Sequence, residues 1–125
     1  MAKNITQFKL DLDNNGNVTH SQISIGIIKG VYVKYDAGSA SGTDVTLECV
    51  NIASGNTTIL SLTNNNTSGW YYPKAEAHDT AGANITFDGS NKIYTDIPVF
   101  GKLKLTQAQN TSEKGVTVFV LVQEY

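Results

Sequence analysis

Apolar and polar residues alternate along most of this chain, and this period of two constrains the fold more than any other feature. Successive side chains of a β-strand point to opposite faces, so alternation is typical of a strand with one buried face. The clearest runs are Phe8, Leu10 and Leu12 between Lys9 and Asp11, and Val45, Leu47 and Cys49 between Thr46 and Glu48. The helix-forming residues 74–77 are too few to sustain a helix.

Clusters of Gly, Asn, Ser and Asp separate these runs about every ten residues, which predicts roughly seven to nine short strands. The predicted strands are 5–12, 21–29, 31–36, 43–52, 57–62, 83–87, 102–107 and 115–123, with shorter apolar segments near 69–72 and 97–100. Ile23, Ile25 and Ile27 share one face of the second strand, and Gly30 indicates a bulge or bend after it.

The last strand, 115–123, is apolar on both faces toward its end, so we expect it in the centre of a sheet or under a covering layer. No linker divides the chain. We therefore predict an all-β fold, a single-domain antiparallel β-sandwich that is jelly-roll-like, over residues 1–125. Within it, residues 1–12 are a candidate N-terminal arm or swapped strand.

An aromatic segment, residues 69–79, holds the only Trp and two of the six Tyr. Pro73 cannot donate a hydrogen bond, so this segment is predicted to be an edge strand or a strand that breaks there. Trp70 and Tyr72 should point to one face and Tyr71 to the other. We expect the rings to anchor the core, and a subunit contact or a ligand platform is the alternative.

The charge pattern excludes some partners. The net charge is −2 and all nine basic residues are Lys. Without Arg the chain lacks the planar fork that reads phosphate and guanine, so no nucleic acid is expected. No apolar run is long enough for a signal core or a membrane span, so we expect synthesis in a cytoplasm, no secretion and no membrane partner.

Metal and thiol chemistry are not predicted. Residues 11–16 match the first half of a calcium loop, but Gln22 stands where the bidentate carboxylate should be. His20 and His78 do not show zinc-site spacing. Cys49 has no cysteine partner and lies in a strand, where a free Cys is usually a small buried hydrophobe.

Catalysis is not predicted either. Glu48, Glu76 and Asp79 are candidate carboxylates for glycosidic cleavage, but nothing in the sequence brings two of them together. The glycine-rich stretch 38–42 is not followed by the Lys and helix of a phosphate loop. We therefore expect no catalytic residues, no cofactor and no metal, and a protein that is not an enzyme.

Three stretches resemble small all-β structural proteins of tailed-phage virions. They read VKYDA at 33–37, GWYYPKA at 69–75 followed by HDTAG at 78–82, and IPVFGKLKL at 97–105. The resemblance covers roughly residues 31–122. It implies a capsid decoration (cement) protein of the virion that binds the major capsid protein and copies of itself, often as a homotrimer. Related small proteins serve at the neck or in the tail.

The predicted interface residues are Trp70, Tyr71 and Tyr72, together with Phe8 in the N-terminal strand, because aromatic side chains often dominate protein contacts. The alternative function is a carbohydrate- or receptor-binding β-sandwich module of a phage tail or fibre. Aromatic rings exposed side by side on a flat face would favour that alternative, and burial of the rings would remove the reason for it.

Overall fold

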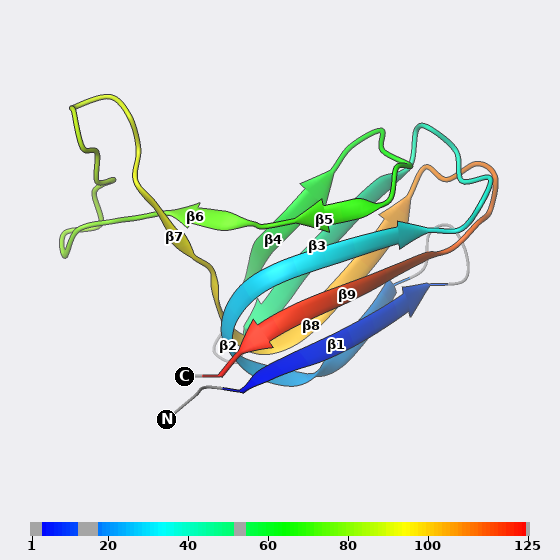
Figure 1. The fold of residues 1–125 in the computed structure, drawn as a ribbon, viewed down its shortest axis with the longest axis horizontal. Helices are drawn as coiled ribbons and strands as arrows, with labels where there is room; N and C mark the ends of the chain where they lie inside the picture. The colour runs from blue at the N-terminus through cyan, green and yellow to red at the C-terminus, as the bar shows by residue number, and fades with distance from the viewer. Residues whose placement is uncertain (1–3, 13–17, 52–54, 125) are drawn as a thin grey trace.

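The protein is a sandwich of antiparallel strands, seen in a computed structural model that describes residues 4–12, 18–51 and 55–124. Those residues form nine strands and no helix (Figure 1). The strands are β1 (Ile5–Leu12), β2 (Val18–Tyr35), β3 (Asp44–Asn51), β4 (Asn56–Leu62), β5 (Gly69–Tyr71), β6 (Lys74–Glu76), β7 (Tyr94–Asp96), β8 (Pro98–Ala108) and β9 (Val116–Gln123). The predicted all-β antiparallel sandwich is confirmed.

One long strand, β2, belongs to both layers of the sandwich (Figure 1). Its first half, Val18–Ile27, pairs with β8, and its second half, Ile27–Tyr35, pairs with β9. One layer therefore has the order β1-β9-β2-β5 and the other β2-β8-β3-β4. The predicted strands 21–29 and 31–36 are thus one strand, and a bulge between Ile28 and Gly30 confirms the predicted irregularity.

The bend of β2 brings its backbone very close to β9. A side chain at Gly26 would place its Cβ 2.2 Å from the carbonyl oxygen of Gln123, which is far inside van der Waals contact. Glycine is therefore required where β2 passes from one layer to the other.

The core lies between the layers and is almost entirely aliphatic. Its fully buried members come from alternate positions, such as Val45, Leu47 and Cys49 in β3. Val116, Val118, Val120 and Val122 are buried in β9, which lies between β1 and β2. The predicted central place of the last strand is confirmed, because β9 has a paired strand on each side.

The candidate N-terminal arm or swapped strand, residues 1–12, contains β1. β1 pairs with β9 of the same chain over eight positions, from Ile5↔Gln123 to Leu12↔Val116. A strand swapped between copies would make the same pairing with a neighbour's β9, so the swapped-strand hypothesis stays a prediction. Residues 1–3 of the candidate N-terminal arm, the turn predicted at 13–17, residue 52 of the predicted strand 43–52 and residue 54 of the turn predicted at 54–56 lie outside the described residues.

The predicted strand at 83–87 is wrong. This segment belongs to no strand, because its pairing is limited to the isolated bridges His78↔Asn84 and Thr86↔Lys92 and the backbone hydrogen bonds beside them. It belongs to a projection, residues 72–96, which we call the arm and which extends away from the sandwich in Figure 1. β6 and β7 pair at its base. Beyond them Ala77, Ile85 and Ile93 are joined in a ring in which each N–H donates to the next carbonyl.

Candidate interaction surfaces

The outer face of the β1-β9-β2-β5 layer carries one row of side chains across four strands, which we call the aromatic row. Strand register places Lys9, Phe119, Tyr32 and Trp70 next to one another in that order. The ring centroids of Tyr32 and Trp70 lie 5.2 Å apart, and those of Tyr32 and Phe119 lie 6.4 Å apart. The Lys9 ammonium lies 6.0 Å from the centroid of Phe119.

Tyr72 extends this row toward the arm. Its ring is 6.3 Å from that of Trp70, with 10° between the two planes. Both rings lie over Gly30, where a Cβ would be 3.5 Å from each of them. Trp70 is 49% exposed and Tyr72 is 66% exposed. The prediction that these two rings anchor the core is therefore wrong, because the outer face of the edge strand β5 has no covering layer among the described residues.

Tyr71 points to the opposite face, as the alternation predicted. It packs against the hydrophobic core, and its hydroxyl accepts a hydrogen bond from the Asn65 side-chain amide at 3.5 Å. The order of the three rings along the chain therefore assigns one to the interior and two to the surface. β5 is an edge strand that ends before Pro73, as Pro73 indicated.

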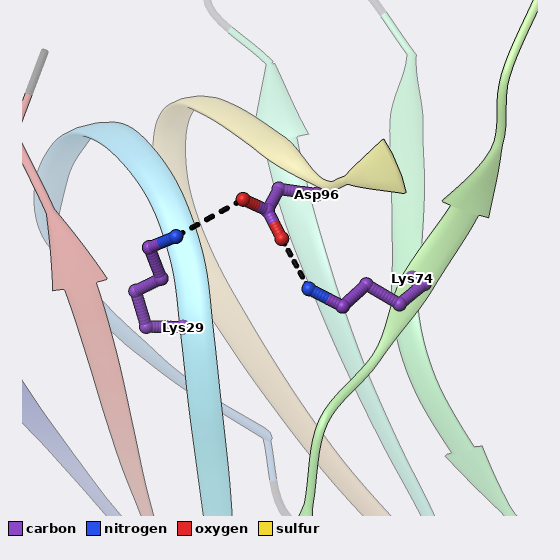
Figure 2. Close-up of polar contacts among 3 residues, drawn as sticks. All are labelled: Lys29, Lys74 and Asp96. Carbon is purple, nitrogen blue, oxygen red and sulfur yellow. Dashed lines mark hydrogen bonds and ion pairs between the residues drawn. The ribbon is translucent and has the colours of Figure 1, made fainter. Parts of the chain in front are cut away.

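A carboxylate at the base of the arm joins the arm to the sandwich. Figure 2 shows Asp96 between two lysines. Asp96 accepts a hydrogen bond from Lys29 of β2 at 3.1 Å and another from Lys74 of β6. These hydrogen bonds hold the pKa of Asp96 below its ordinary value, and the one from Lys74 has the largest effect.

Polar contacts maintain the outer part of the arm. Lys92 donates to Glu76 at 2.8 Å, and Asn84 donates to the same carboxylate at 2.7 Å. The hydrogen bond from Lys92 is the main reason that the pKa of Glu76 is lowered. At the tip, Asp88 accepts backbone N–H groups from Ser90 and Asn91, which lower its pKa.

Apolar side chains of the arm stay uncovered. Phe87 at the tip is 71% exposed and Tyr94 is 57% exposed. From residue 72 to residue 96 no side chain is buried. The arm therefore has no core of its own.

A second exposed apolar surface lies on the outer face of the β2-β8 half of the sandwich. Ile23 and Ile25 are more than half exposed, and Phe100, which pairs with Ile25, is 46% exposed. The β2 bulge explains this arrangement. Before the bulge the even-numbered residues Ser24 and Gly26 face inward, and after it the odd-numbered Val31 faces inward.

A groove of about 360 Å³ opens where β1 and the first half of β2 border the two layers. Phe8 and Thr6 of β1 line one side, and Ser24 and Ile25 of β2 line the other. Phe8 is half-buried and packs against the core. Ser24 is 2% exposed, and its Oγ has no hydrogen-bond partner among the described residues. The sequence analysis did not predict this groove, and the only local signal for it is the pair of small residues Ser24 and Gly26 inside the isoleucine run.

The thiol and the carboxylates considered above as reactive groups are either buried or hydrogen-bonded within the fold. Cys49 is buried in β3, and burial raises the pKa of its thiol. Glu48 accepts a hydrogen bond from Asn56, whereas Asp79 accepts the N–H groups of Ala81 and Ala83 in the arm. Among the described residues no group of His, Cys, Asp and Glu is placed to hold a metal ion. The same residues include no helix long and apolar enough to cross a membrane.

No protein-family model, no curated protein and no solved structure matches this chain. The surfaces described above therefore carry the functional argument, together with the resemblance of the three sequence stretches.

Proposed function

We propose that this chain is a non-catalytic structural protein of a phage virion, a capsid decoration protein that binds the major capsid protein and other copies of itself. The observation that carries the proposal is the arm, a long ordered segment without one buried side chain that projects from a complete sandwich. The resemblance of 33–37, 69–82 and 97–105 to virion proteins supports it.

The energetics of the arm support a role in assembly. Ordering the backbone costs about 1–2 kcal/mol per residue. The exposed ion pairs of the arm offset little of that, because such pairs contribute about 0–1 kcal/mol each. Burial of apolar surface is the larger stabilising contribution in folding, and the arm has little of it, since Ala75 at its base packs against the core but Phe87 and Tyr94 stay exposed. Contact with a neighbouring protein would supply it.

The outer apolar surface of Ile23, Ile25 and Phe100 is the proposed contact with the capsid shell. Large exposed apolar patches mark protein-binding sites, and these three side chains adjoin one another on paired strands. A hollow of about 350 Å³ beside Ile23, with Gly101 in its lining, adds shape to this surface. A stable contact would bury more than about 1,000 Å² in total, so the proposed partner would have to cover the arm as well as this surface.

Binding to shells that lack the protein tests the proposal. Purified chain is mixed with such shells and sedimented, and the retained protein is measured. Ile25→Asp should abolish retention, because it would bury a charge in the contact. Val18→Asp is the matched control, since Val18 is an exposed residue of the same strand. Absence of retention for the unchanged chain would contradict the proposal.

A second candidate function is saccharide binding, as in a receptor-binding module of a tail or fibre. The nearly parallel rings of Trp70 and Tyr72 on an open sheet face favour it. Titration with oligosaccharides should then shift the fluorescence of Trp70, the only Trp. Tyr72→Ala should weaken that response, and Phe100→Ala, on the other layer, should leave it unchanged. An unaltered spectrum with every saccharide class would contradict this candidate.

A further inference from the structure

We propose that the segment 83–87 of one copy adds as a strand to the free edge of β2 in a second copy, with Phe87 entering the groove beside Ser24. This inference rests on the proposed assembly function and names the contact between copies. It starts from two incomplete features of the same chain, a strand-like segment without a sheet and a sheet edge without a strand.

The incoming segment has the pattern of a strand. Ala83, Ile85 and Phe87 alternate with Asn84 and Thr86. In the free chain it makes two isolated bridges, and the backbone groups of Ala83, Ile85 and Phe87 bond to residues 77–79 and 91–93 of the arm. The Phe87 side chain is nevertheless 71% exposed. Because backbone groups of successive strand residues point to opposite edges, an added strand pairing would use Asn84 and Thr86, and it would cover the Phe87 ring.

The receiving edge is the first half of β2. From Val18 to Gly26 this strand pairs with β8 on one side, and its other side carries no strand among the described residues. Such an edge presents unpaired N–H and C=O groups to any incoming strand. The edge is also one border of the groove described above.

The lining of the groove suits an occupant that has both apolar and polar groups. Phe8 and Val122 give it apolar walls, whereas the buried Oγ of Ser24 has no partner. An unpartnered buried hydroxyl costs about 1–3 kcal/mol. A strand entering here would place the Phe87 ring against Phe8 and would offer a backbone N–H or C=O to Ser24.

The two surfaces differ from each other, so the contact is heterologous. Copies joined in this way form a closed ring if the rotation closes, and an open chain if it does not. The arm of each copy would then serve one neighbour while its groove receives the arm of another.

Mixing two defective variants tests this arrangement by light-scattering mass. Phe87→Asp removes the arm contact, and Thr6→Trp fills the groove. Each variant alone should be monomeric, while the unchanged chain forms larger species. An equimolar mixture should form a 1:1 dimer, because one intact arm still meets one intact groove. Thr80→Asp on the arm and Gln7→Trp on the other face of β1 are controls that should keep the unchanged mass.

A monomeric unchanged chain would overturn the inference. So would an unchanged mass for either variant, or a mixture that stays monomeric. Retention on capsid shells is measured separately. A monomer that binds shells overturns only this contact, whereas a multimer that ignores shells overturns only the proposed function.

Discussion

The Lys29 ammonium of β2 lies 3.1 Å from the Asp96 carboxylate of β7, and this ion pair connects the arm to the sandwich (Figure 2). The same carboxylate holds Lys74 of β6. One acidic side chain thus bonds both to β2 of the sandwich and to β6 of the arm. The pair is partly exposed, so it positions the arm more than it stabilises the fold.

Asp96→Asn should loosen the arm and leave the sandwich almost unchanged. The neutral amide cannot hold both lysines, and the exposed pair contributes about 0–1 kcal/mol to global stability. Hydrogen exchange of residues 74–96 should become faster, while the melting temperature changes little. Glu113→Gln, an exposed acid in a turn outside the arm, is the control. A large fall in melting temperature would contradict this view of the arm.

Acid should release the arm. The folded-state pKa values of Asp96 and Glu76 are lowered by their lysine partners, so their stabilising contribution is complete above the ordinary carboxyl pKa. It is lost as the pH falls through the lowered values. Exchange of arm amides, corrected for intrinsic rates, should therefore accelerate below pH of about 4, at which ordinary carboxylates begin to protonate. An equal acceleration of amide exchange in β3 would contradict the prediction that acid releases the arm before the core.

Tyr35→Phe should leave stability unchanged or raise it by up to about 1 kcal/mol. The Tyr35 hydroxyl is buried without a hydrogen-bond partner among the described residues, so its removal loses no bond. Thermal or denaturant unfolding measures the difference. A clear destabilisation would show that the hydroxyl has a partner.

The same tyrosine should make the fold sensitive to alkali. Burial, with the nearby Tyr71, raises the pKa of Tyr35 to about 12 from the model-compound value of 10.0. Because the folded-state pKa is the higher one, this contribution to stability is complete below pH 10 and falls as the pH rises toward 12. Absorbance titration should show one tyrosine ionising late, and Tyr35→Phe should remove that step.

Gly101→Ala should destabilise the protein by about 1–3 kcal/mol, the usual cost of overpacking. The added Cβ would lie 1.9 Å from the backbone carbonyl oxygen of Val50, so β3 and β8 would have to separate. Gly69→Ala is the matched control, because a Cβ there meets nothing within 4 Å. Equal stability of the two variants in urea would contradict the close packing of these strands.

Alternation was sufficient to predict the strands that make the core, because burial of one face requires it. Residues 5–12 match β1, and the inward set of β9 follows directly from its valines. The alternation of Trp70, Tyr71 and Tyr72 was also predicted from the same rule. Which face of that edge strand is covered depends on the neighbouring layer, and no local pattern contains that information.

The other differences between the predicted and the observed structure also arise from contacts between distant parts of the chain. Ile23, Ile25 and Ile27 before Gly30 and Val31, Val33 and Tyr35 after it are all odd-numbered, so the sequence shows one continuous pattern. The bulge reverses which of them face inward, and it leaves Ile23 and Ile25 outside. Likewise, 83–87 alternates as a strand should, but its backbone hydrogen bonds are divided between residues 77–79 and 91–93, so neither pairing extends into a ladder.

Hydrogen exchange of the arm on assembled particles tests the central claim most directly. The chain is measured free and bound to capsid shells, and exchange of residues 72–96 is compared with that of the β3 core. We predict that the arm exchanges quickly in the free monomer, at dilutions where copies do not associate, and becomes strongly protected on the particle, while β3 stays protected in both. An arm that exchanges equally fast on and off the shell would contradict it.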